Sequence, residues 1–191
     1  MINAKIPDGD DYNDRIAVVK LLVNCERIHD AENEKYIWQG VEVAKGDYRN
    51  GGFTINLPDN IDNLKPFDFD LPPKIKMSKE NVMFANADLI AYNENDEQVG
   101  YFLYGHVFFC NETVAFGELL YFDRDFTIVG SDTEIKENYT LDSSASCKFK
   151  KGWNFLYDYG VNANPKRNYT SKITTSEPDC MYWNFRTSDI Y

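Results

Sequence analysis

The chain has 191 residues with 31 acidic and 20 basic side chains, which gives a net charge of -11, and its residues are 43% hydrophobic and 15% aromatic. This size suits one domain of ordinary to large size or two small ones, and the apolar content argues against disorder. The negative surplus repels phosphate backbones and so disfavours nucleic acid as a partner, and no apolar run reaches the ~20 residues of a membrane-spanning helix.

The N-terminal half contains several segments that alternate between apolar and polar residues, which is typical of half-buried strands. Ala17–Cys25 alternates in this way, and Phe53–Leu57 follows the turn-forming residues Asn50-Gly51-Gly52. Tyr36–Ala44 and Ala85–Tyr92 are further candidates. The segment Glu26–Tyr36 is so polar that we predict a loop there.

The C-terminal half continues the β pattern. Val99–Phe109 and Val114–Phe122 are apolar on both faces, as in central strands, and Phe126–Val129 and Met181–Phe185 are shorter candidates. In Ile135–Phe149 six of the eight odd positions are apolar or aromatic, and the alternation resumes in Trp153–Val161 after a predicted turn, so these segments predict a hairpin.

These patterns predict an all-β protein with about ten strands and little helix, arranged as an antiparallel β-sandwich of the transthyretin-like or immunoglobulin-like kind. We predict a single domain over residues 1–191. Pro58–Lys79 contains four prolines and little alternation, so it reads as a long connection that either crosses between sheets or splits the chain into two lobes near residues 58–79.

The cysteines and sequons are weak signals. Cys25, Cys110, Cys147 and Cys180 form no C-x-x-C pair, and they permit either buried free thiols or two disulfides in three connectivities. Three N-x-T sequons occur, which is close to the number expected by chance. They begin at Asn111, Asn138 and Asn168.

Catalytic candidates are few. The chain has two histidines, His29 in an acidic segment and His106 in an aromatic strand, and no nucleophile motif accompanies them. Carboxylate pairs of the glycosidase kind are Asp68 with Asp70, Asp123 with Asp125, and those of Glu94–Glu97. The segment Glu94–Gln98 reads more simply as a hairpin tip. With 31 acidic residues such pairs arise by chance, so we predict no catalytic residue and no cofactor.

Oxygen ligands for a metal are crowded in Asp8–Asp14, where a calcium loop is one interpretation. The EF-hand pattern fails there, because its glycine and terminal glutamate are absent from their positions. A solvated acidic turn is the simpler interpretation, and we predict no metal site.

The aromatic residues offer the best candidate for ligand binding, because a ring presents a rigid apolar face to a sugar. Most rings fall on alternating strand positions that predict core burial. Tyr36, Trp38 and Tyr182 fall on positions predicted to face outward. We therefore predict that these three side chains bind a ligand.

Four stretches together resemble a known kind of domain. They are Asp11–Val23, Tyr48–Pro58, Val99–Tyr104 and Lys150–Asn154. In this order they resemble small secreted or lipoprotein-type β-domains of Gram-negative gut anaerobes, and Tyr48–Pro58 is also similar to the central hairpin of transthyretin-like and carboxypeptidase-regulatory sandwiches. The resemblance implies a β-sandwich exported to the periplasm or cell surface and tethered through a lipidated cysteine upstream of this chain. It supplies no catalytic residues.

The expected function is that of a non-enzymatic envelope module that binds glycan or a host surface protein. One alternative is a structural subunit of a surface assembly of the fimbrial kind. Another is a hydrolase that uses two facing carboxylates in a cleft. The sequence leaves the oligomeric state open.

Overall fold

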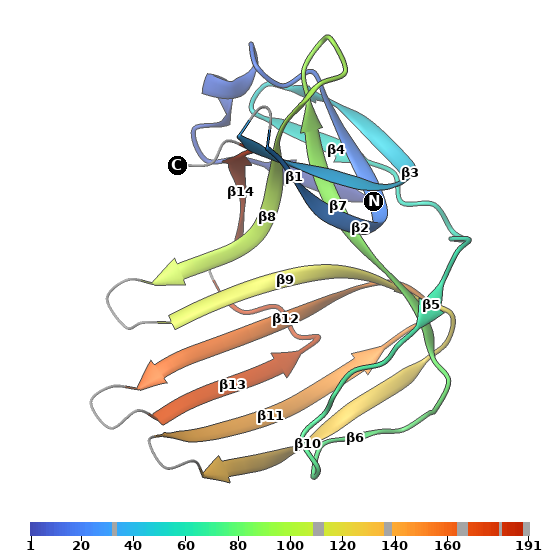
Figure 1. The fold of residues 1–191 in the computed structure, drawn as a ribbon, viewed down its shortest axis with the longest axis vertical. Helices are drawn as coiled ribbons and strands as arrows, with labels where there is room; N and C mark the ends of the chain where they lie inside the picture. The colour runs from blue at the N-terminus through green and yellow to red at the C-terminus, as the bar shows by residue number, and fades with distance from the viewer. Residues whose placement is uncertain (32–33, 109–112, 136–138, 164–167, 180, 189–191) are drawn as a thin grey trace. The chain divides into compact units, whose positions relative to one another are not determined.

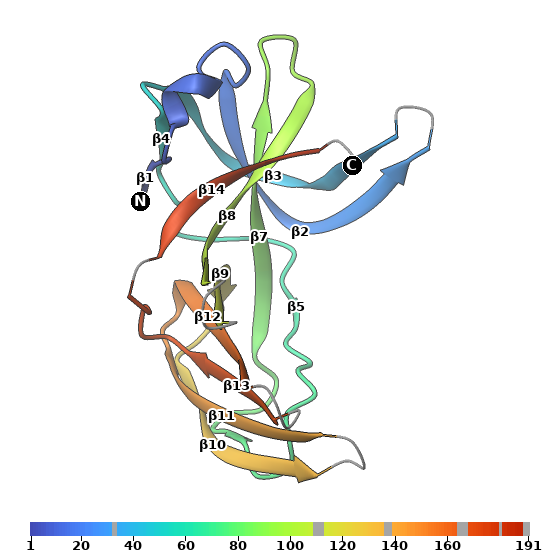
Figure 2. The same ribbon diagram turned by 90° about the vertical axis from the view of Figure 1, so that its left-hand side faces the viewer.

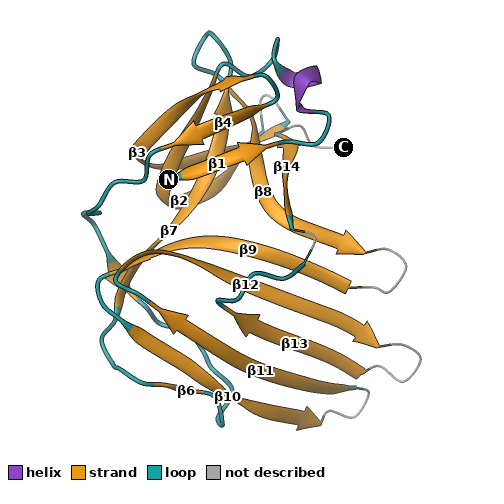
Figure 3. Ribbon diagram, turned by 180° about the vertical axis from the view of Figure 1, so that it is seen from behind, coloured by secondary structure: helices purple, strands orange, loops and turns teal. Residues whose placement is uncertain are grey.

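The computed structural model describes residues 1–31, 34–108, 113–135, 139–163, 168–179 and 181–188. They form fourteen strands and one short 3-10 helix, Gly9–Tyr12 (Figures 1 and 3). The prediction of an all-β fold with little helix is therefore confirmed, with more strands than the ten or so expected; the two-sheet sandwich stays a prediction. In this described part of the chain no helix has the length and apolar character needed to cross a membrane.

The chain divides into two compact units, and neither is a continuous stretch of sequence. Unit 1 contains Met1–Asp62, Ala85–Tyr104 and the C-terminal segment from Tyr182, and unit 2 contains Asn63–Phe84 and Gly105–Met181. The chain first passes between the units at Asp62, within the proline-rich connection. It passes between them again inside two strands and before Tyr182.

Unit 1 is built on antiparallel neighbours. Its strands follow the order β1 (Ile2–Lys5), β4 (Gly52–Ile55), β3 (Lys35–Arg49), β2 (Val18–Asp30), β7 (Met83–Tyr92) and β8 (Gln98–Phe108), and β14 (Tyr182–Thr187) pairs with β8. β2 and β3 run side by side as a long two-stranded ribbon (Figure 2). Residues 26–30, predicted as loop, continue β2 along this ribbon, and that prediction is wrong.

A β-bulge explains why the sequence pattern failed in this ribbon. Val23 pairs with Val41 and Glu26 with Gln39, so two residues of β2, Asn24 and Cys25, lie opposite Gly40 alone. An extra residue in one strand exchanges the two faces of everything that follows it. The alternation that is continuous up to Val23 therefore resumes with the opposite parity.

Gly40 is required at this bulge. A Cβ atom on Gly40 would lie 2.6 Å from Cys25 Sγ and 3.0 Å from the Val23 carbonyl oxygen. Asn24 takes up the local bend with a left-handed φ of 53°, a conformation that asparagine tolerates better than most residues.

Unit 2 is organised around a second set of paired strands. Their order is β9 (Thr113–Phe122), β12 (Gly152–Ala163), β13 (Asn168–Thr174), β11 (Thr140–Phe149), β10 (Phe126–Ile135) and β6 (Lys76–Met77), as Figure 1 shows. The short β5 (Lys65–Pro66) pairs with Met83 and Phe84 at the start of β7. β11 and β13 are parallel, and the other pairs of this set are antiparallel.

The predicted hairpin between Ile135–Phe149 and Trp153–Val161 is wrong in its pairing. β13 lies between the two strands, parallel to β11 and antiparallel to β12. The burial pattern was nevertheless correct at the end of β11, where Ala145, Cys147 and Phe149 are buried. Alternation reports which face is covered, and it carries no information about which strand is the neighbour.

The proline-rich connection contributes to the core of unit 2. Phe67 and Ile75 belong to a cluster of eleven buried residues and pack with side chains of β9, β10, β11 and β12. Phe122 lies at the centre of its aromatic part, with ring centroids 4.7 Å from Phe149, 4.8 Å from Phe126 and 5.3 Å from Phe67. The connection therefore also contributes buried side chains to the hydrophobic core of unit 2.

Candidate functional site

Four side chains from the β2–β3 ribbon form what we call the arginine–aromatic ladder: Arg27, His29, Tyr36 and Trp38. Arg27 pairs with Trp38 and His29 with Tyr36 across the two strands. Directly paired residues of antiparallel strands project from the same face, so the four side chains share one side of the ribbon. The bulge at Asn24 and Cys25 brings Arg27 and His29 of β2 to the side of Tyr36 and Trp38.

Arg27 is the exposed cation of the ladder. Its guanidinium carbon lies 3.6 Å from the ring centroid of Tyr36 and 5.6 Å from that of Trp38. The ring of His29 lies 5.5 Å from that of Tyr36. The aromatic rings attract the guanidinium through their negative faces and restrict where it can lie.

Trp38 is held by the side chain of Gln98 at the start of β8. The Trp38 N–H donates to Gln98 Oε1 at 2.8 Å, and Gln98 Nε2 donates to the Trp38 carbonyl at 2.7 Å. This pair of bonds has the donor and acceptor pattern of a neighbouring strand, so a side chain satisfies the backbone at this position. Gln98 Nε2 also lies 3.0 Å from the Tyr92 hydroxyl oxygen.

Tyr36 is fixed through the end of β14. Its N–H donates to the carbonyl of Ser188 at 3.1 Å, and the Ser188 N–H donates to the Val99 carbonyl at 3.4 Å. Ser188 is buried. The ladder is thus attached to β8 at two points, through Gln98 and through Ser188.

Trp38 also belongs to a small cluster of buried residues with Leu22, Ile90 and Tyr92, against which Cys25, Tyr36 and Tyr101 pack. The ring of Tyr101 lies 4.6 Å from that of Trp38. Burial raises the pKa of Cys25 to about 12, helped by the nearby carboxylate of Asp88. Burial also raises the pKa of Asp88, and the hydrogen bond with Cys25 opposes that rise. A thiol in this state is a poor nucleophile, because the thiolate is the reactive form.

Lys20 lies beside this cluster, next to Tyr92. Its ammonium lies 4.2 Å from the ring centroid of Tyr92, 2.6 Å from Asp96 and 3.4 Å from Glu42. The hydrogen bond with Asp96 raises the pKa of Lys20 against the desolvation that lowers it. Lys20 therefore has its carboxylate partners within the protein and is engaged in structure.

The three side chains predicted to bind a ligand are placed differently from one another. Trp38 was expected to face outward, and this is wrong, because its exposed fraction is only 7%. The face of β3 that carries Trp38 is covered by Leu22, Ile90 and Tyr92. Tyr36 is partly buried and packs against the same cluster.

Tyr182 is separate from the other two. It is 38% exposed and begins β14, whereas the contact of this segment with Tyr36 is made at its other end by Ser188. Six residues of extended chain span about 20 Å. The structure thus brings Tyr36 and Trp38 together and leaves Tyr182 outside the ladder.

Sequence reasoning missed Arg27 and Gln98. Arg27 was assigned to a loop, although Arg27 and His29 alternate with Glu26 and Ile28 just as Tyr36 and Trp38 alternate across the turn. Two short alternating runs on either side of a polar turn are a hairpin signal that could have revealed the ladder. Nothing in the sequence indicates that Gln98 binds the backbone of Trp38, 60 positions away.

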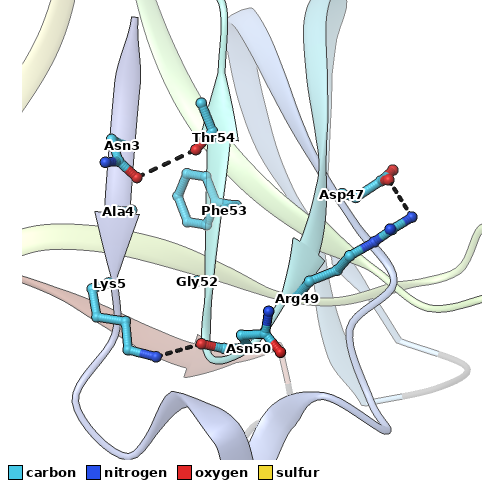
Figure 4. A pocket seen from close by; sticks show the side chains of 9 residues that line it. All are labelled: Asn3, Ala4, Lys5, Asp47, Arg49, Asn50, Gly52, Phe53 and Thr54. Carbon is cyan, nitrogen blue, oxygen red and sulfur yellow. Dashed lines mark hydrogen bonds and ion pairs between the residues drawn. The ribbon is translucent and has the colours of Figure 1, made fainter.

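A groove of about 570 Å³ lies on the outer face of β1, β4 and β3 (Figure 4). Its polar groups satisfy one another: Lys5 donates to the Asn50 carbonyl, Arg49 pairs with Asp47 at 2.6 Å, and Thr54 donates to Asn3 at 3.3 Å. Both of its cations already have oxygen partners in the groove itself. The ladder therefore has the stronger claim as a ligand site.

The predicted carboxylate pairs have structural partners. Asp123 pairs with Arg124 at 2.6 Å and Asp125 with Lys150 at 3.0 Å. The hydrogen bond from Arg124 lowers the pKa of Asp123, and the backbone N–H of Lys151 does the same for Asp125. A general acid at neutral pH needs a raised pKa, so this pair lacks that property. Asp68 and Asp70 are exposed, and Asn93–Glu97 forms the expected hairpin tip between β7 and β8.

The remaining candidates from the sequence are the acidic loop, the cysteines, His106 and the sequons. Across the described ranges no group of three or more His, Cys, Asp or Glu side chains could hold a metal ion, and the Asp8–Asp14 loop folds as a turn with the 3-10 helix. Cys25 and Cys147 are free thiols, while Cys110, Cys180, Asn111 and Asn138 lie outside the described residues. His106 lies in β8 and Asn168 in β13.

Comparisons of the chain with protein-family models, with curated proteins and with solved structures found no match.

Proposed function

We propose that this protein is a non-enzymatic binding module that recognises carbohydrate through the arginine–aromatic ladder. The observation that carries the proposal is the exposed guanidinium of Arg27, which lies 3.6 Å from a half-buried tyrosine ring. A sugar has apolar C–H faces and a rim of hydroxyl groups. The exposed ring of His29 suits the first, and the N–H donors of Arg27, whose guanidinium rests on the Tyr36 ring, suit the second.

We also propose that the module acts outside the cytoplasm, in the periplasm or at the cell surface. The support for this location is the resemblance to secreted and lipoprotein-type β-domains. Such a module would be held at the membrane by a lipid anchor upstream of the chain, and its ligand would be a glycan of the cell envelope or the surroundings.

The experiment is a glycan array probed with the wild-type chain and with Tyr36→Ala and Tyr182→Ala variants. We expect Tyr36→Ala to abolish the sugar signal and Tyr182→Ala to leave it unchanged, because Tyr182 is an exposed tyrosine of the same unit outside the ladder. Circular dichroism checks that each variant is folded, and Tyr36→Phe, which keeps the ring, should retain binding. An array without signal, or a signal indifferent to Tyr36→Ala, would overturn the proposal.

A structural subunit is the second candidate, and one observation favours it. β10 pairs with β11 along ten residues but with β6 at only two, Ile128 and Val129. A strand donated by another subunit could extend the sheet along the rest of that edge. Analytical ultracentrifugation tests this, since strand exchange predicts oligomers that grow with concentration and a monomer at high concentration would contradict it.

A further inference from the structure

We propose that the sugar recognised by the arginine–aromatic ladder carries a carboxylate, as uronic acids do, and that Arg27 binds this group. The inference rests on the proposed function and adds the chemical class of the ligand. It assigns to Arg27 the specificity for charge, and to Tyr36 and Trp38 the positioning of its guanidinium.

The first step is that Arg27 has no anionic partner among the described residues. Among the described residues no carboxylate lies within ion-pair distance of Arg27, whereas Arg49 and Arg124 pair with Asp47 and Asp123, each at 2.6 Å. This difference occurs in a chain with 31 acidic and 20 basic side chains. An exposed arginine that rests on rings is available to an external anion.

The second step is the geometry of the guanidinium. At 3.6 Å the Tyr36 ring is in van der Waals contact with one face of the group and shields that face from water. A guanidinium binds a carboxylate through two parallel N–H···O bonds made at its edge, which leaves its faces for rings. The ring and the anion therefore do not compete for the same part of Arg27.

The third step is the charge of the surface around Arg27. Strand alternation places His29 on the face of Arg27 and places Glu26 and Ile28 on the opposite face. Asp30 pairs across the ribbon with Lys35, a residue of opposite charge. Further along β3, Glu42 has the same parity as Tyr36 and Trp38, but it pairs with Lys20 at 3.4 Å. On a protein of net charge -11 the part of this face around Arg27 is thus complementary to an acidic ligand.

The experiment uses calorimetry with three probes: a trigalacturonic acid, its fully methyl-esterified form and a hexaglutamate peptide. The ester keeps the sugar and removes the charge, and the peptide keeps the charge and removes the sugar. We expect the acid to bind at least tenfold more tightly than the ester and the peptide. Equal binding of acid and ester would overturn the inference while leaving the proposed function standing. Equal or tighter binding of the peptide would also overturn it, in favour of an acidic protein partner.

Variants locate the effect. Arg27→Gln should lower the affinity for the acid at least tenfold, to the level of the ester, and Arg49→Gln is the matched control because Arg49 is an exposed arginine of the same unit already paired with Asp47. Arg27→Lys should also lose about tenfold, since lysine keeps the charge and lacks the planar fork. Binding retained in Arg27→Lys, or lost equally in Arg49→Gln, would show general charge attraction and overturn the inference. If the acid does not bind while neutral sugars bind on the array, only the inference fails; if no sugar binds at all, the proposed function fails with it.

Discussion

The two units use their aromatic rings in different ways. In unit 1 the rings beside the β2–β3 ribbon are tyrosine and tryptophan, and they hold cations: Lys20 over Tyr92 and Arg27 over Tyr36. In unit 2 the rings of the main core cluster are phenylalanines that pack against one another around Phe122, and two buried tyrosines, Tyr121 and Tyr157, lie outside this cluster. The rings beside the β2–β3 ribbon thus have polar groups, whereas the rings of the cluster around Phe122 have none.

This difference indicates which side-chain changes should affect stability and which should affect binding. Phenylalanine has no hydrogen-bonding group, so a buried cluster of such rings contributes through packing and burial alone. Tyrosine and tryptophan can face water at one edge and still support a charge. A change in the phenylalanine core should therefore affect stability, and a change in the ladder should affect binding more than stability.

The largest expected effect is the loss of Phe122. The ring is fully buried and contacts several others, so Phe122→Ala should lower the free energy of unfolding by about 3–5 kcal/mol. The control is Phe69→Ala, which removes a ring that is 48% exposed and should change the stability by less than about 1 kcal/mol. Urea denaturation measures both. Similar losses in the two variants would contradict the description of a tightly packed core in unit 2.

Glycines provide the next comparison. A Cβ atom on Gly46 in unit 1 would lie 2.1 Å from the backbone oxygen of Thr54, whereas one on Gly160 in unit 2 would meet no atom within 4 Å. Gly46→Ala should therefore cost about 1–3 kcal/mol through overpacking. Gly160→Ala should stabilise by about 0.5–1 kcal/mol, because alanine reduces the freedom of the unfolded chain. Thermal unfolding of both variants checks the signs, and a loss at Gly160 would mean that this face is covered.

Much of the fold could be predicted from the sequence, because burial on one face of a strand leaves a period of two. The β class, the buried face of Ala145 to Phe149 and the hairpin tip at Asn93–Glu97 follow from local patterns of this kind. The insertion of β13 between β11 and β12 could not be predicted, because strand pairing depends on residues distant in sequence.

The candidate site was predicted only in part. Tyr36 and Trp38 were selected together, and they do lie together, but the direction assigned to Trp38 was wrong. The face of β3 that carries Trp38 is covered by Leu22, Ile90 and Tyr92, and the register between β2 and β3 shifts twice, between Leu21 and Leu22 and between Val23 and Glu26. Alternation is reliable only as far as the next bulge, and the bulge depends on a close contact between Gly40 and Cys25 that no local pattern encodes.

The free thiols allow a smaller effect to be measured in each unit. Burial raises the pKa of Cys25 to about 12 and of Cys147 to about 11, and only Cys25 has a carboxylate, Asp88, as a further cause. Asp88→Asn should therefore speed alkylation of Cys25 at pH 8 by up to about tenfold, one pKa unit, while Cys147 is unchanged. Iodoacetamide labelling followed by peptide mass spectrometry reports each cysteine separately. Equal acceleration at both sites would indicate general loosening of the fold and contradict a local role of Asp88.

The smallest expected effects concern ion pairs. These pairs predict that the two units lose stability at opposite ends of the pH range. In unit 2 hydrogen bonds from Arg124 and Lys74 lower the pKa of Asp123 and Asp132, so this support is present above the ordinary carboxyl pKa and is lost as the pH falls through the lowered values. In unit 1 the pKa of Lys20 is raised, so its contribution to stability is complete below the ordinary lysine pKa and is lost as the pH rises through the raised value.

Amide hydrogen exchange should then show unit 2 loosening first in acid and unit 1 first in strong alkali. Asp123→Asn should flatten the acid response and Lys20→Gln the alkaline one, each by no more than about 1 kcal/mol because the pairs are near the surface. Asp88 strengthens the contrast, since burial raises its pKa and its protonation in acid removes a buried charge from unit 1. Simultaneous loss of both units at both extremes would show instead that they unfold as one cooperative body.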